Sequence, residues 1–88
     1  MIAVVLLTCD RLEYTRRTID SFIEQNAAGL AAGAFKLWHC DDASTDPKVR
    51  KAAAQAGFAP LIQTLERAGV TEMIRRASRK LEHAGAEW

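Results

Sequence analysis

The residues best suited to chemistry in this sequence follow three short apolar runs. Residues 8–11 (TCDR) come after the first run, residues 41–46 (DDASTD) after the second, and residues 66–69 (ERAG) after the third. Carboxylates accept hydrogen bonds from base N–H groups and ribose hydroxyls, whereas a guanidinium holds phosphate through two parallel hydrogen bonds. These residue types therefore indicate a ligand with hydrogen-bond donors at one end and phosphates at the other.

One carboxylate of the second polar stretch has a purely structural explanation. Asp46 precedes Pro47, an order typical of a helix start, where the Asp caps the helix and the Pro takes the first helical position. Capping does not explain Asp41 and Asp42, whose charges repel each other unless nearby donors or a ligand offset the repulsion. Two hypotheses follow: either Asp42 binds a ligand, or the loop only begins a helix.

The surrounding pattern predicts the elements that position these loops. Strands are predicted over residues 2–8, 35–40 and 59–65, each followed by a helix, and the charge-free segment 26–34 is predicted to be a loose loop. This alternation predicts an α/β fold, a Rossmann-like three-layer αβα arrangement around a parallel sheet. Ligands bind such sheets beyond the carboxyl ends of the strands, where the three polar loops converge. Neither GxGxxG nor GxxxxGKS/T is present, which argues against dinucleotide and P-loop sites.

The last predicted helix follows Gly69, is amphipathic and is expected to end at Gly85. Its predicted apolar face consists of Val70, Met73, Ile74, Ala77, Leu81 and Ala84. Trp88 is expected to belong to a further strand, so the chain reads as interrupted there.

Composition narrows the function classes. The chain has 88 residues and a net charge of +1, which predicts one domain without the positive field that recruits nucleic acid or acidic membranes. The apolar N-terminus is too short to span a bilayer, so we expect no membrane segment and a cytoplasmic location. Cys9 and Cys40 form no CxxC pair. Because His39 and Cys40 point to opposite faces of a strand, no metal site is expected in this chain.

Two stretches carry a resemblance to a known family. The string TCDRLEYTRRTIDSFIEQN, followed by a strand and DDASTD, resembles the N-terminal half of glycosyltransferase family 2 enzymes, which have the GT-A fold. The chain departs from the family pattern at Cys9, where Tyr is common, and at Ala43, where Gly is common. The resemblance implies that residues 1–88 form a single, truncated domain that binds the nucleotide of a sugar donor, typically a UDP-sugar.

The resemblance also implies individual roles. Thr8, Cys9 and Asp10 would line the base pocket, and Asp42 would accept a hydrogen bond from the uracil ring. Arg67 would face the base or a phosphate, and Asp41 would brace the loop. Arg11 completes the predicted nucleotide-binding set as a second guanidinium at the same sheet edge.

The resemblance implies an incomplete enzyme. In the family, the next strand leads to a D-x-D motif that holds a divalent metal, Mn or Mg, and an acceptor half supplies the general base. We therefore expect a metal cofactor only in a full-length relative, and no sugar transfer by this chain alone. The alternative is a flavodoxin-like α/β interaction module in which the acidic loop only caps a helix. In either case a three-stranded sheet exposes an apolar edge through which a homodimer can form.

Overall fold

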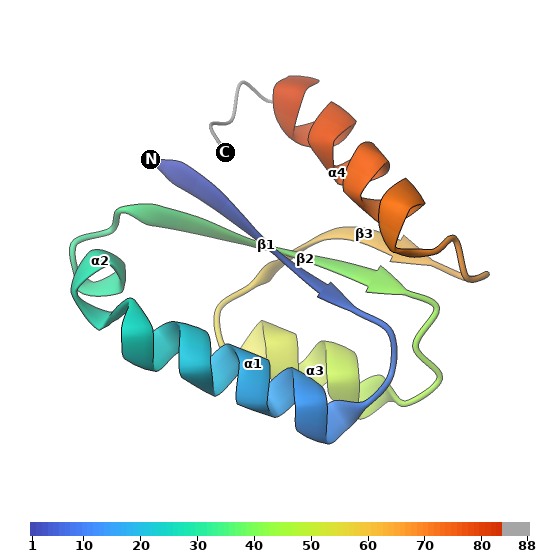
Figure 1. The fold of residues 1–88 in the computed structure, drawn as a ribbon, viewed down its shortest axis with the longest axis horizontal. Coiled ribbons are helices and arrows are strands. Elements are labelled where there is room, and N and C mark those ends of the chain that lie inside the picture. The colour runs from blue at the N-terminus through green and yellow to red at the C-terminus, as the bar shows by residue number, and fades with distance from the viewer. Residues whose placement is uncertain (84–88) are drawn as a thin grey trace.

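The computed structural model describes residues 1–83 as an α/β fold built on a parallel sheet. In Figure 1 the strands β1 (Ile2–Thr8), β2 (Phe35–Asp42) and β3 (Ala59–Thr64) lie in the order β1-β2-β3. The helices are α1 (Leu12–Gln25), α2 (Ala27–Ala31), α3 (Pro47–Gln55) and α4 (Val70–His83). The predicted α/β class and parallel sheet are confirmed.

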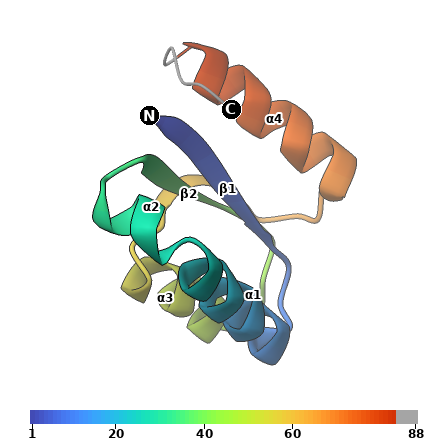
Figure 2. The same ribbon diagram turned by 60° about the vertical axis from the view of Figure 1, so that its left-hand side comes forward.

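The helices cover the two faces of the sheet unequally. Helices α1 and α3 lie side by side on one face, and α4 crosses the other face, as Figures 1 and 2 show from two directions. The side chains of each strand alternate between these faces, so both faces need apolar residues. Leu6 packs with Ile19 and Phe58 under α1 and α3, while Cys40 packs with Met73 under α4. The continuous apolar run of β1 is the sequence signature of this two-sided burial.

Two predicted boundaries are wrong. The second strand continues through Asp42 rather than ending at Cys40, because Asp41 pairs with both β1 and β3 and Asp42 pairs with β3. The predicted loose loop at 26–34 contains the short helix α2. Alanine has the highest helix propensity, and Gly29 lets α2 approach Phe35 so closely that an added Cβ would lie 2.6 Å from its ring.

The predicted apolar face of the last helix is buried only in part. Met73, Ala77 and Leu81 are buried against the sheet, but Val70 is 68% exposed and Ile74 is 49% exposed. Met73, Ala77 and Leu81 are spaced four residues apart and make the contact with the sheet, while Val70 and Ile74 lie to the side of this contact. The predicted helix end and further strand involve Ala84, Gly85 and Trp88, which lie outside the described residues. No helix within residues 1–83 has the length and apolarity needed to cross a bilayer.

Candidate functional site

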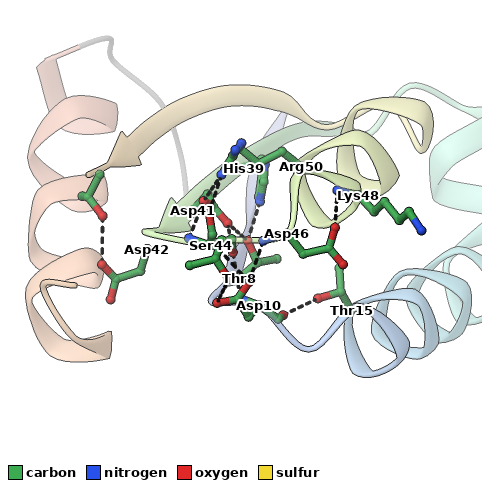
Figure 3. A network of polar contacts seen from close by, with 12 residues as sticks. Thr8, Asp10, Thr15, His39, Asp41, Asp42, Ser44, Asp46, Lys48 and Arg50 are labelled. Carbon is green, nitrogen blue, oxygen red and sulfur yellow. Dashed lines mark hydrogen bonds and ion pairs between the residues drawn. The ribbon is translucent and has the colours of Figure 1, made fainter. Parts of the chain in front are cut away.

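Asp41 and Asp42 lie on opposite faces of the sheet. Both are the last residues of β2, where consecutive side chains alternate in direction. Asp41 points toward α1 and α3, and Asp42 points toward α4, away from the cluster around Asp41 in Figure 3. The strand geometry thus separates the two adjacent charges, and each carboxylate has its own set of donors.

The carboxylate of Asp41 is a buried structural anchor. Its Oδ1 accepts hydrogen bonds from Thr8 Oγ1 at 2.7 Å and from Ser44 Oγ at 2.5 Å. Its Oδ2 accepts from the Ser44 amide and from Arg50 Nη1, each at 3.1 Å. Burial works against ionisation, but the hydrogen bonds from Ser44 and Thr8 outweigh it and hold the pKa of Asp41 below 3.8. With both oxygens engaged, Asp41 ties β1, β2 and α3 together.

His39 extends this network as a neutral ring. Thr8 has one hydroxyl hydrogen and donates it to Asp41, so the His39 Nε2 atom, 2.7 Å from Thr8 Oγ1, must carry a hydrogen and donate it to Thr8. Burial lowers the pKa of His39 below 6.5, against the opposing charge of Asp41. His39, Asp41 and Arg50 also line a cavity of about 330 Å³ between α3 and β3.

Asp10 clamps the first polar loop to the second. Its Oδ1 accepts from the backbone amides of Thr45 at 2.8 Å and Asp46 at 3.0 Å, and its own amide donates to Ser44 Oγ at 2.7 Å. The hydrogen bond from the Asp46 amide is the largest of the effects that lower the pKa of Asp10. Asp10 adopts a left-handed backbone with φ of 54°, which Asp tolerates better than most residues. The side chain therefore faces the 44–46 loop.

Asp42 organises the third polar loop in the same way. Its Oδ1 accepts from the Ala68 amide at 2.7 Å and from Thr64 Oγ1 at 2.9 Å, while Oδ2 accepts from the Gly69 amide at 2.8 Å. Burial raises the pKa of Asp42, but the two amides, the Thr64 hydroxyl and the charge of Arg67 together lower it below 3.8. A carboxylate offers about four acceptor positions. One position on Oδ2 therefore remains for a further donor.

A small cavity brings three of the predicted residues together. Thr8, Cys9 and Asp42 line it, together with Val70 and Met73 of α4 and two strand residues, and its volume is about 100 Å³. Small-molecule sites usually have volumes of about 300–1,000 Å³, so this cavity can take one flat ring but not a whole nucleotide. The rest of such a ligand would lie on the open surface beyond the strand ends.

The two predicted guanidiniums lie at different places. Arg67 belongs to the loop that Asp42 holds, and its charge acts on that carboxylate. The guanidinium of Arg11 lies 5.0 Å from the centroid of the Tyr14 ring and lines a separate depression at the start of α1. The predicted set therefore divides. Thr8, Cys9 and Asp42 line the small cavity and Arg67 lies in the loop beside Asp42, whereas Asp10, Arg11 and Asp41 do not line the cavity.

Several partners of these carboxylates were not among the predicted site residues. Thr64 at the end of β3 and Arg50 on α3 each bind a predicted Asp, and Ser44 contacts both Asp10 and Asp41. Arg50 lies on the helix that Asp46 caps. Its position near the start of this helix, close to the end of β2, is the signal that could have paired it with Asp41. Asp46 itself accepts from the Lys48 amide at 2.9 Å, which confirms its predicted capping role.

The described residues hold no donor set for a metal ion. Within residues 1–83 no three His, Cys, Asp or Glu side chains come together in a geometry that could bind a metal. His39 and Cys40 lie on opposite faces of the sheet, as their adjacency in a strand predicts. No protein-family model, no curated protein and no solved structure matches this chain. The family resemblance therefore rests on the residues of the two stretches themselves.

Proposed function

We propose that this chain is a GT-A-like domain that binds the nucleotide of a UDP-sugar at the carboxyl edge of its sheet. The observation that carries the proposal is the small cavity where Thr8, Cys9 and Asp42 meet. These residues come from the ends of two neighbouring strands, which is where ligands bind in open parallel sheets. The uracil ring occupies the cavity, and the remaining acceptor position of Asp42 Oδ2 receives its N3–H.

The groups around Asp42 keep its side chain in the ionised form, which accepts hydrogen bonds. The carboxylate is 6% exposed and stays ionised because two loop amides and a hydroxyl donate to it. Three donors already fix the orientation of this buried carboxylate, so its last acceptor position points in a defined direction. Such preorganisation favours tight binding. Arg67, at the rim of the same loop, supplies the positive charge for the diphosphate.

The proposal concerns donor binding, not sugar transfer. The described residues offer neither a metal-binding group nor an unengaged carboxylate beside the cavity that would serve as general base. In this proposal, any transfer activity requires residues beyond this chain, in a glycosyltransferase that works in the cytoplasm.

Binding of UDP to two matched variants tests the proposal. We expect UDP to shift the backbone amide resonances of Cys9, Ala68 and Gly69 in two-dimensional NMR spectra of the unmodified chain. Asp42→Asn removes the charge and the free acceptor position, and should weaken UDP binding at least about tenfold, or 1.4 kcal/mol. Asp46→Asn is the control, because Asn caps a helix as well as Asp does and Asp46 does not line the cavity.

A second candidate function is supported by the same contacts. Asp42 uses three of its acceptor positions inside the chain, so it has a complete structural role without any ligand. The chain would then be an α/β interaction module. An unchanged spectrum at millimolar UDP would favour this module over the nucleotide site.

A further inference from the structure

The outer edge of β1 is an unpaired row of backbone groups. The Ile2 amide donates to the Ala34 carbonyl, so the even-numbered residues of β1 direct their N–H and C=O groups toward β2. The odd-numbered residues Ala3, Val5 and Leu7 therefore direct theirs outward. Within residues 1–83 the sheet contains only β1, β2 and β3, and β1 is at one end of it. Three outward donors and three outward acceptors thus have no strand partner there.

The two edges of the sheet differ in their protection. The β3 edge contains Pro60, which has no N–H, and Lys80 Nζ donates to the Leu61 carbonyl at 3.0 Å. Proline and lysine are devices that natural sheets use against pairing with another chain. The β1 sequence, IAVVLLT, contains neither a charge nor a proline. Strand addition is therefore far more favourable at β1 than at β3.

We propose that the β1 edge binds a second copy of this chain in an antiparallel pair centred on Val5. A two-fold axis at Val5 places Val5 opposite Val5 of the second copy, and Ala3 opposite Leu7 of the second copy. All outward groups are then matched, because each opposed pair exchanges two N–H···O bonds, making six bonds in total. The two three-stranded sheets become one continuous six-stranded sheet with α4 of both copies on the same face.

Exposed apolar side chains lie where this pairing needs them. The same register places Met1 of the second copy opposite Cys9, which borders the small cavity beside Val70. Met1 is 72% exposed and Val70 is 68% exposed in the single chain. Because the dimer is two-fold symmetric, Met1 of each copy lies beside Val70 of the other, and the pairing covers both sets of side chains. The net charge of +1 per chain gives only weak repulsion between two copies. This self-complementarity selects a second copy of the chain as the occupant of the β1 edge.

Sedimentation and hydrogen exchange on the unmodified chain test the pairing without a mutation. Sedimentation velocity between about 1 µM and 1 mM should show a monomer–dimer equilibrium. Above the transition, the amides of Ala3, Val5 and Leu7 should exchange at least about tenfold more slowly than in dilute solution. The Gln63 amide, on β3, should exchange at the same rate at both concentrations.

Val5→Pro is the matched substitution. The Val5 N–H points outward, so proline removes two of the six interchain bonds and none of the β1–β2 bonds. We expect its dimer dissociation constant to rise at least tenfold while the amide spectrum stays folded. A monomer at 1 mM would overturn the proposal. So would a dimer whose concentration-dependent protection lies at β3 or on α4 rather than at the three odd-numbered residues, and this second result does not depend on whether the Pro variant folds.

Discussion

Replacing Asp42 with Ala should destabilise the fold far more than its position at a strand end suggests. The substitution removes hydrogen bonds of 2.7, 2.8 and 2.9 Å that join the end of β2 to Ala68, Gly69 and Thr64. Hydrogen bonds to charged groups contribute about 1.5–3 kcal/mol each, but the half-buried loop amides regain water when the carboxylate is lost. We therefore expect the free energy of unfolding to fall by about 2–4 kcal/mol in total.

This loss is a large fraction of the stability of so small a domain. At about 0.05–0.15 kcal/mol per residue, a chain of 88 residues has roughly 4–13 kcal/mol of stability. The melting temperature of Asp42→Ala should fall by about 8–32 °C, because each kcal/mol corresponds to about 4–8 °C in a domain of this size. Loss of the helix cap in Asp46→Ala should cost only about 1 kcal/mol.

Urea unfolding followed by far-ultraviolet circular dichroism measures both variants against the unmodified chain. Unchanged m-values would show that the same surface is exposed on unfolding, so that differences in midpoint report stability. A loss below about 0.5 kcal/mol for Asp42→Ala would refute the reasoning, because the loop at 66–69 would then hold its position without the carboxylate.

Four further outcomes are expected. Because His39 has a lowered pKa in the fold, the unfolded chain binds more protons below pH 6.5, so the free energy of unfolding should fall as pH drops from 7 to 5, and less steeply in His39→Gln. Asp10→Ala should lower the midpoint of urea unfolding, whereas exposed Asp20→Ala, which breaks no such hydrogen bonds, should leave it nearly unchanged. Mass spectrometry after brief iodoacetamide treatment at pH 8 should find Cys9 alkylated and Cys40 intact, because Cys40 is fully buried and its pKa is raised to about 11. The purified chain should transfer no sugar from a UDP-sugar, and detectable transfer would contradict the incomplete-enzyme proposal.

The sequence predicted those features that depend on local pattern. The three strands and the cap at Asp46 follow from short runs whose signals lie within a few residues of one another. The short helix α2, in a segment predicted to be a loop, has a local cause too, because the helix propensity of its alanines outweighs the glycine and the lack of charge. Local pattern thus determined the layers of the fold but not every short element.

The roles of the carboxylates depend on contacts that no local pattern contains. Asp10 binds amides of residues 45 and 46, and Asp42 binds amides of residues 68 and 69, in both cases across a strand boundary. Asp41 and Asp42 point in opposite directions because β2 extends through both of them. This extension depends on pairing with the neighbouring strands β1 and β3. Tertiary pairing, which the sequence pattern underestimates at strand ends, decides which carboxylate faces the small cavity.

The most direct measurement compares UDP with CDP, which carry the same ribose and diphosphate. Uracil presents an N3–H donor, whereas cytosine presents a lone pair at N3, so only UDP can donate from N3 to the remaining acceptor position of Asp42 Oδ2, and the N3 lone pair of CDP would face the carboxylate with like polarity. Titrations followed through the amides of Cys9 and Gly69 should show UDP binding at least about tenfold tighter than CDP. Equal affinities, or shifts confined to residues away from the cavity, would contradict recognition of uracil by Asp42.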